Sequence, residues 1–254
     1  MNSYLVFARK ESREIVRSWR IWVLPAIIVF FAISGPLLAR FTPEIIGSLA
    51  GSQLGHLTLP QPTYLDAYGQ WAKNLSQIAV FALIIIYGGI VSSETTSGTA
   101  ILVLTKPMSR SAFVIVKAVI HSAFVAILLI LGTFITWGLT ALIFGTAPGG
   151  ALWSSALVWL VLGVFFIALV TLFSVVIPSA VGAAGAGIGA YVVLSIAAIW
   201  KPLSDYSPAG LAGQAATLAA GTTTASSLWP VVTGLALAAG FVWLAVVLFR
   251  HKEL

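Results

Sequence analysis

Of the 254 residues in this chain, 59% are hydrophobic and 8% are charged, whereas a soluble globular domain has about 25% charged residues. This composition supplies too little polar surface for a water-soluble core, and lipid favours helices because each backbone group is bonded within its own segment. The net charge of +6 comes from basic residues that flank apolar runs, without the interleaved aromatics typical of a nucleic-acid surface. We therefore expect an all-α membrane protein that binds no nucleic acid.

Metal and disulfide chemistry is not expected either. The sequence contains no cysteine, which excludes disulfides and thiolate ligands. Its three histidines, His56, His121 and His251, are too far apart in the sequence to suggest a metal centre. We predict no metal site and no catalytic residue on this chain.

Residues 1–20 are predicted to form an amphipathic helix that lies in the membrane interface. Apolar residues recur at helical spacing from Leu5 to Val23, while basic residues populate the other face. Basic side chains are attracted to an anionic leaflet, and tryptophan suits the headgroup boundary. A topology anchor and a contact with a partner protein both explain such a helix. The residues that carry this prediction are Arg9, Arg13, Arg17 and Trp19.

Six stretches without Asp, Glu, Lys or Arg are long enough to cross a bilayer, since about 20 helical residues span about 30 Å of hydrocarbon. The Pro178-Ser179 break separates the fourth stretch from the fifth. We interpret residues 1–254 as a single transmembrane domain with six crossings. The predicted spans are 21–39, 76–92, 118–144, 153–177, 179–200 and 229–249.

The distribution of lysine and arginine predicts the orientation of these spans. Ten of the thirteen basic residues lie before the first span, in the 93–117 loop, or after the last span. Because cytoplasmic loops carry an excess of Lys and Arg, both termini and the 93–117 loop should be cytoplasmic. The expected location is the cell membrane, as a multi-pass protein.

The tracts 40–75 and 201–228 are predicted to be loops on the outer side. Within the first of them, Tyr64, Tyr68 and Trp71 share one helical face, which predicts a helix lying at the outer interface. Core packing or membrane anchoring explains such aromatic residues more often than ligand stacking does.

The 93–117 loop contains an apolar run, residues 100–104, that is far too short to cross the bilayer. Gly98 and Pro107 bracket this run as helix breakers, so we predict a short helix at the membrane surface. Its apolar side would dock on a cytoplasmic partner, or fold back on the lipid and on neighbouring helices. After Pro107, Ser109 can cap a new helix that runs through Lys117 into the third span.

These features together resemble the type-2 ABC transporter permeases, the membrane subunits of ATP-driven exporters. The acidic residue at the end of the second span, Gly98-Thr99, the KPMSR stretch at 106–110 and the later Lys117 follow the order of the family motif. The segment ARKESREIVRSWRIW resembles the opening interfacial helix of that family, and RHKEL resembles its basic ending.

The resemblance implies that the 93–117 loop is a coupling loop whose short helix docks on a cytoplasmic ATPase subunit. The implied coupling residues are Glu94, Gly98, Thr99, Ile101, Leu102, Leu104, Lys106, Pro107, Ser109 and Arg110. The chain itself contains no GxxxxGK[ST] phosphate loop. ATP and Mg²⁺ would therefore bind the partner, and this chain is expected to be neither an enzyme nor the carrier of a cofactor.

Glycines in the fifth span suggest close helix approach, since each costs up to about 1 kcal/mol of helix propensity. Packing within one subunit and a seam between two permease copies both explain them, and the resemblance favours the seam. The residues concerned are Gly182, Gly185 and Gly189.

The expected function is the export of a hydrophobic or amphipathic substrate by alternating access. A structural or assembly protein without transport activity is the alternative. An intramembrane protease is less expected, because the sequence offers no aspartate pair or HExxH motif at membrane depth.

Overall fold

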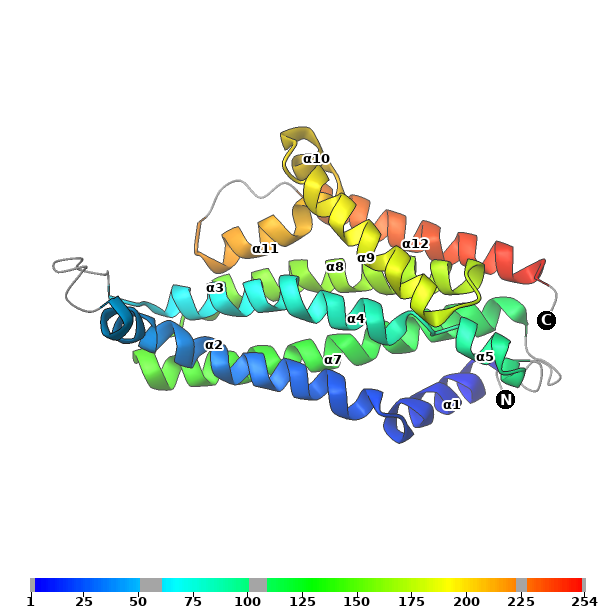
Figure 1. Ribbon diagram of the computed structural model, residues 1–254, viewed down its shortest axis with the longest axis horizontal. Coiled ribbons are helices and arrows are strands. Elements are labelled where there is room, and N and C mark those ends of the chain that lie inside the picture. The colour runs from blue at the N-terminus through cyan, green and yellow to red at the C-terminus, as the bar shows by residue number, and fades with distance from the viewer. Residues whose placement is uncertain (1–2, 51–60, 101–108, 223–227, 253–254) are drawn as a thin grey trace.

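The computed structural model describes residues 3–50, 61–100, 109–222 and 228–252. All regular structure in these ranges is helical (Figure 1). Six helices are long and apolar enough to cross a membrane, which confirms the predicted all-α fold and the count of spans. They are Arg20–Gly47, Tyr64–Thr96, Arg110–Phe144, Gly149–Val176, Ala180–Ala197 and Trp229–Arg250.

The first two helices are α1, Ser3–Arg17, and α2, Arg20–Ala50. The hydroxyl of Ser18, between them, donates to the carbonyl of Ile15 at 3.1 Å. Helix α2 continues well past residue 39, into the tract predicted as an outer loop. The prediction ended at Arg40 because hydrophobicity ends there. Arg40 and Glu44 lie 3.7 Å apart at i,i+4 spacing, a pair that favours helix continuation.

The second span is assembled from α3, Tyr64–Asn74, a π-helical turn at Leu75–Ala79, α4, Val80–Tyr87, and α5, Ser92–Thr96. The predicted helix around Tyr64 is continuous with this span. Tyr68 and Trp71 are fully buried, because the Trp71 ring fits against Ile28 where Gly132 leaves room for it.

Helices α7, Arg110–Phe144, and α8, Gly149–Val176, form a long hairpin. Ser109 caps α7 as predicted, since its Oγ accepts from the amide of Ala112 at 3.1 Å. Gly145 ends α7 with φ of 75°, a conformation that glycine adopts without steric cost. Helix α8 packs against α4, α7, α9, α11 and α12, so it forms the centre of the bundle.

The chain then crosses back in α9, Ala180–Ala197, after the predicted break, with Ser179 as its N-cap. The predicted outer loop contains α10, Lys201–Tyr206, a 3₁₀ turn at Pro208–Gly210, and α11, Leu211–Ala219. Ser155 of α8 donates to the carbonyl of Ala215 at 2.7 Å and so ties α11 to the bundle. The last helix is α12, Trp229–Arg250.

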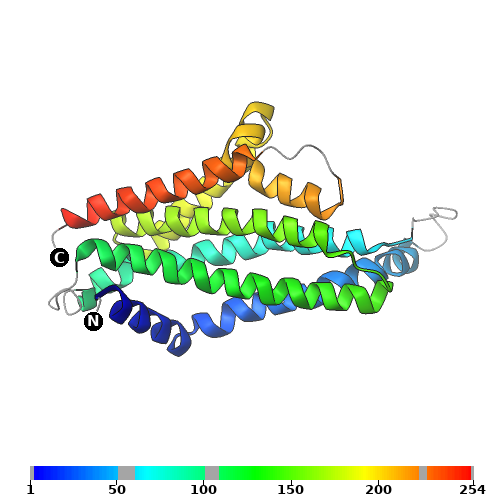
Figure 2. The same cartoon turned by 180° about the vertical axis from the view of Figure 1, so that it is seen from behind.

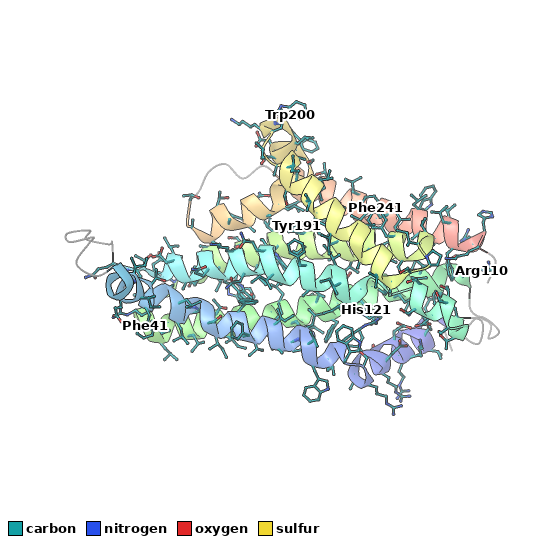
Figure 3. All side chains as sticks on the ribbon, in the orientation of Figure 1. Phe41, Arg110, His121, Tyr191, Trp200 and Phe241 are labelled. Atoms are coloured by element: carbon teal, nitrogen blue, oxygen red, sulfur yellow. The ribbon has the colours of Figure 1, made fainter. Side chains whose placement is uncertain are left out.

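Helix α9 crosses the bundle obliquely and carries α10 outward (Figures 1 and 2). Trp200 lies at the protruding tip (Figure 3). The start of α1, α5 and the end of α12 lie together at one end of the bundle (Figure 1). We call this the termini end, and the opposite end, where α2 finishes and α7 turns into α8, the far end. An even number of crossings requires this shared end for both termini.

Candidate functional site

A buried ion-pair network joins three helices at the termini end. The Nζ of Lys117, on α7, lies 3.0 Å from Oε2 of Glu11 on α1 and 2.5 Å from Oε1 of Glu94 on α5. The side chains of Lys117 and Glu11 are each only 1% exposed, and that of Glu94 is 13% exposed. The two ends of the 93–117 loop are thus bonded to each other, and both are held to α1.

Lys10 extends this network toward the surface. Its Nζ lies 2.9 Å from Oε1 of Glu11, 3.2 Å from Oε1 of Glu94 and 2.5 Å from Oε2 of Glu14. Burial alone lowers the pKa of Lys10, but the hydrogen bond with Glu14 and the charges of Glu11 and Glu94 outweigh it, so the pKa is raised. Burial likewise raises the pKa of Glu14, and the bond from Lys10 with the charge of Lys117 brings it below the usual value.

The carboxylates are already paired with ammonium groups of the protein. Glu11, Glu14 and Glu94 each place one oxygen within 4.8 Å of the others, an arrangement that could suggest a cation site. The Nζ of Lys10 lies within hydrogen-bond distance of all three acids, and that of Lys117 lies within hydrogen-bond distance of Glu11 and Glu94. The cluster is a structural network, and removing one partner would leave the others charged in a poorly solvated place.

Aromatic rings pack beneath the network and join α1 to α7 and α12. The rings of Phe7 and Phe113 stack at 5.5 Å, and those of Phe113 and Phe249 stack at 5.2 Å with 6° between their planes. The Nζ of Lys117 lies 5.1 Å from the centre of the Phe113 ring, within the range of a cation–π contact. The network therefore packs against these stacked apolar rings.

The second span is interrupted next to this network, and α8 satisfies the backbone groups that the interruption frees. The amides of Val91 and Ser92 donate to the Oγ of Ser174 at 3.0 and 2.9 Å. A Cβ at Gly88 would lie 2.6 Å from the carbonyl oxygen of Ala180, so α4 and the start of α9 touch through backbone. The contact between α4 and α9 fixes the direction in which α5 continues from α4.

His121 borders the network on its membrane side, in the interior of the bundle (Figure 3). Its Nε2 lies 3.8 Å from Oε2 of Glu11, and its ring lies 4.8 Å from that of Tyr87. Neither ring nitrogen has a hydrogen-bond partner within the described part of the chain. His121 is therefore a buried polar group beside Glu11.

Residues 58–252 match the model of a family described as "Protein of unknown function (DUF2705)". The chain belongs to the DUF2705 family. The matched region contains Glu94 and Lys117 and covers more than half of the sequence. A search of curated proteins finds no match.

In this DUF2705 protein the predicted coupling residues differ in their surroundings. Glu94 takes part in the buried network. Gly98 has φ of 74°, as expected of a helix breaker, and nothing lies within 4 Å of where its Cβ would be. The hydroxyl of Thr99 donates to the carbonyl of Glu94 at 3.3 Å. The predicted residues outside the described ranges are Ile101, Leu102, Leu104, Lys106 and Pro107.

The remaining two predicted coupling residues bond within the chain. Ser109 caps α7, and the guanidinium of Arg110 donates to the carbonyls of Arg250 and Lys252 at 3.0 and 2.7 Å. Arg110 thus ties the start of α7 to the end of α12, where free carbonyls favour a cation. Figure 3 shows Arg110 at the termini end.

The glycines of α9 differ in their surroundings. Gly185 and Gly189 face open space, while a Cβ at Gly182 would touch Ile177 at 3.0 Å. Gly187, a further glycine of the same span, is the most closely packed of these glycines. A Cβ there would lie 2.7 Å from Ile84 and 2.9 Å from Val170.

Helix α1 faces the bundle with a different stripe from the one its hydrophobicity suggests. Of the predicted apolar face, Ile15 is buried but Leu5 and Val16 are exposed, whereas Phe7 and Glu11, which the prediction left off that face, are buried. Glu11 is buried because Lys117 supplies a partner, which hydrophobic periodicity does not register. The residues predicted for the membrane interface are exposed; they are Arg9, Arg13, Arg17 and Trp19.

Sequence reasoning also missed Lys10, Glu11 and Glu14 as site residues. The available signal was Lys117, a charge within an otherwise apolar helix, because such a residue requires an acidic partner. Four acids lie on the same predicted side, and Glu94 was the only one of them selected; the others are Glu11, Glu14 and Glu253.

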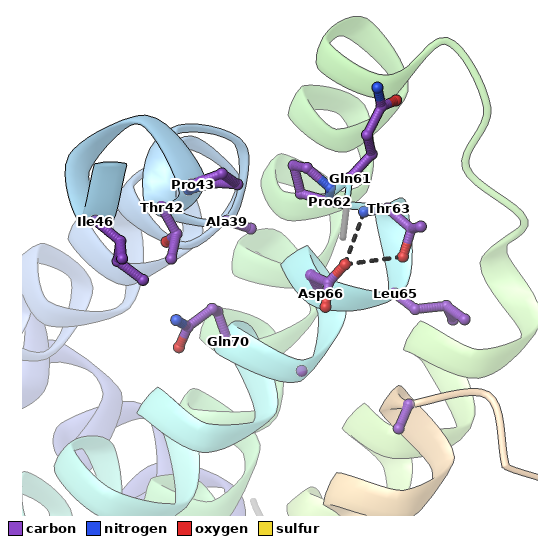
Figure 4. A pocket seen from close by; sticks show the side chains of 12 residues that line it. Ala39, Thr42, Pro43, Ile46, Gln61, Pro62, Thr63, Leu65, Asp66 and Gln70 are labelled. Atoms are coloured by element: carbon purple, nitrogen blue, oxygen red, sulfur yellow. Dashed lines mark hydrogen bonds between the residues drawn. The ribbon is translucent and has the colours of Figure 1, made fainter. Parts of the chain in front are cut away.

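A separate cavity of about 700 Å³ lies at the far end, between α2 and the start of α3. Thr42 and Ile46 line it from α2, and Asp66 and Gln70 from α3 (Figure 4). One oxygen of Asp66 accepts from both the amide and the hydroxyl of Thr63, at 2.7 and 2.9 Å. This carboxylate therefore caps α3, and the cavity shares no residue with the network.

Proposed function

We propose that this protein is the permease subunit of an ATP-driven ABC exporter. The observation that carries the proposal is the bridge from Glu11 to Lys117 to Glu94. It connects both ends of the 93–117 loop and the N-terminal helix in a single bonded unit. A loop that only linked two spans would not need a buried charge network at its base.

The network gives the loop a mechanical role in the proposed cycle. A cytoplasmic ATPase subunit docks on the loop and closes when it binds ATP and Mg²⁺. The resulting displacement passes through Glu94 to α4 and through Lys117 to α7, while Glu11 carries α1 along. Because packed interfaces switch between discrete arrangements, this movement opens the bundle to one side of the membrane and then to the other.

The chemistry of the interior favours a hydrophobic or amphipathic substrate. Beyond the network and His121, the buried polar side chains among the described residues are serines and threonines. Four of the eight hydroxyls donate to helix carbonyls, as Thr136 does to Ala32 and Thr171 to Ile167. An interior without fixed charge offers no binding site for a small ion.

The exposed face of α9 supports a second permease copy as partner. Val181 and Ile196 on this face are 82% and 62% exposed. Gly185 and Gly189 share the face and have no neighbour that would explain a missing side chain. Small residues between large apolar ones allow two helices to approach closely in a membrane.

The docking role is tested by replacing residues 98–104 with a flexible polar linker of equal length in a tagged chain. The wild type, purified from membranes of its own host, should retain an ATPase that contains a phosphate loop. The replacement should lower the retained ATPase by about tenfold or more. Replacement of residues 223–227 by a polar linker of their own length, in the tract predicted to lie on the opposite side, serves as the control and should retain the ATPase fully.

Absence of any ATPase from the wild-type complex would favour the alternative, a structural or assembly protein. Full retention by the 98–104 replacement would remove the docking role from this loop.

The seam is tested by disulfide trapping, since the chain has no cysteine of its own. Gly185→Cys and Gly189→Cys should each yield crosslinked dimers in the membrane. Ala183→Cys is the matched control because Ala183 lies on the same helix and is fully buried. Equal crosslinking of Ala183→Cys, or none at the glycine positions, would reject the seam.

A further inference from the structure

A second hollow, a groove of about 880 Å³, lies on the outer surface of the bundle near the termini end. Its volume falls within the range of about 300–1,000 Å³ typical of ligand pockets. Helices α7 and α12 form its walls, α8 forms its floor, and Tyr4 of α1 closes one edge. Alanines give it depth, namely Ala118, Ala168, Ala238 and Ala239.

The groove opens on the surface that faces lipid. Val119, Leu235 and Trp243 line it and are 57%, 47% and 67% exposed. Exposed apolar side chains of this size belong in contact with hydrocarbon in a membrane protein. The apolar part of the groove therefore suits a hydrocarbon chain that enters from the bilayer.

The end of the groove nearest the termini is polar and positively charged. Ser109, Ser111 and Arg250 line this end. Arg250 is exposed, and its Nε and Nη2 donate hydrogen bonds to the Oγ of Ser111 at 3.0 and 2.7 Å. This support holds the guanidinium at the mouth of the groove and leaves Nη1 without a hydrogen bond inside the described part of the chain.

Two more cations lie beside Arg250. Arg110 donates to the carbonyl of Arg250, and the Nζ of Lys252 donates to the carbonyl of Val175 at 2.6 Å. Their partners are carbonyl and hydroxyl groups, and within residues 3–50, 61–100, 109–222 and 228–252 none of the three cations forms an ion pair. Positive charge at this mouth is therefore not neutralised by the described acids.

We propose that this groove binds an anionic phospholipid of the leaflet at the termini end. The phosphate lies against Arg250 and the hydroxyls of Ser109 and Ser111, and one acyl chain lies between α7 and α12 along the alanines. Planar guanidinium groups bind phosphate oxygens with directional, charge-assisted bonds. The combination of an apolar groove with an unneutralised cationic mouth matches a ligand that is both hydrocarbon and anion. This site does not depend on the transport function proposed above.

The proposal is tested by native mass spectrometry of the delipidated protein in detergent. The probes are dioleoylphosphatidylglycerol, dioleoylphosphatidylcholine with the same chains, and glycerol phosphate without chains. The anionic lipid should bind with a stoichiometry of one and at least about tenfold more tightly than the zwitterionic lipid. Glycerol phosphate should show no retained binding, because the groove contributes through the chain.

Two variants separate the headgroup contact from the chain contact. Arg250→Gln should reduce the preference for the anionic lipid to about twofold or less, and Arg250→Lys should restore part of it. Arg17→Gln changes the net charge equally, from an exposed position on α1 outside the groove, and should leave the preference intact.

Ala239→Trp fills the groove and should abolish the tight binding of both lipids. Ala236→Trp, at an exposed position of α12 outside the groove, should not.

Equal affinity for the two lipids in the wild type would overturn the assignment of an anionic ligand. Undiminished binding by Ala239→Trp would place the lipid elsewhere on the protein. Retention of glycerol phosphate at the affinity of the whole lipid would reduce the site to a phosphate contact and reject the role of the groove.

Discussion

The two ends of the bundle are held together by different kinds of interaction. At the termini end, Lys117 is buried between Glu11 and Glu94, and charge sets the position of the helices. At the far end, the Arg40–Glu44 pair remains 46% and 62% exposed on one helix, so no buried ion pair joins helices there among the described residues.

Shape and backbone bonding hold the far half instead. The Tyr68 hydroxyl donates to the carbonyl of Pro148 at 3.3 Å, and that of Thr136 donates to the carbonyl of Ala32 at 3.3 Å. Trp71 packs where Gly132 lacks a side chain. The end that carries the 93–117 loop is thus held together by buried charges, and the other end by tight packing.

The largest expected effect comes from Lys117→Met. This change leaves Glu11 with only the partly exposed Lys10 as a partner, and breaking a buried pair typically costs about 3–5 kcal/mol. The free energy of unfolding in mixed detergent micelles, followed by tryptophan fluorescence, measures the loss. Arg40→Met removes one partner of an exposed pair and is the control, with an expected cost of about 0–1 kcal/mol.

The same network predicts a rescue. Combining Lys117→Met with Glu11→Leu removes both charges and should recover part of the lost free energy of unfolding, because the uncompensated buried acid is gone. If Lys117→Met costs no more than Arg40→Met, charge pairing is not what holds α1 to α7.

A smaller effect is expected from Gly132→Ala, where shape instead of charge is decisive. The added Cβ would lie 2.6 Å from Ile28 and 2.7 Å from Trp71, and overpacking of this kind costs about 1–3 kcal/mol. Gly138→Ala is the matched control on the same helix, since nothing lies within 4 Å of its Cβ. It should be neutral or stabilising by up to about 1 kcal/mol. Equal thermal stability of the two variants would show that the contact with Trp71 is not tight.

Sequence patterns predicted the six spans because uncharged length is a direct consequence of the bilayer as solvent. The helix starts at Ser109 and Ser179 were also accessible, since capping is a local interaction. The helices within residues 40–75 and 201–228 could not be predicted in this way. Helix α11 and the buried face of α3 depend on contacts with α8 and α7, and residues such as Tyr68 are ambiguous between membrane interface and core until their neighbours are known.

The site shows the same limit. Glu94 and Lys117 could be selected because they stand beside or within apolar segments, but their direct bond joins residues 23 apart. Glu11 bonds to Lys117 across 106 residues, and its helical period places it among polar neighbours. Only the packing of Phe7 on Phe113 brings it inward. Long-range pairing of this kind is set by tertiary structure, and no local pattern encodes it.

The smallest effect concerns pH at the outer part of the network. The pKa of Glu14 lies below its ordinary value of 4.5 because, although burial raises it, the bond from Lys10 and the charges of Lys117 and Arg20 lower it further. Its contribution to stability is therefore complete above pH 4.5 and is lost as the pH falls through the lower folded value. The pKa of Lys10 is raised above 10.5, so its contribution is lost only as the pH rises through that higher value.

Between these limits the Lys10–Glu14 bond should persist, and acidification below pH 4.5 should loosen α1 before α3. Hydrogen exchange of the α1 amides, corrected for the intrinsic rate at each pH and compared with α3, measures this. Both side chains are 39% exposed, so solvent screening keeps the change small. Glu14→Gln should lower the protection of α1 at neutral pH and shrink its loss on acidification. Identical acid profiles for the variant and the wild type would place the acid sensitivity of α1 on other groups and leave the Lys10–Glu14 bond without a role in holding this helix.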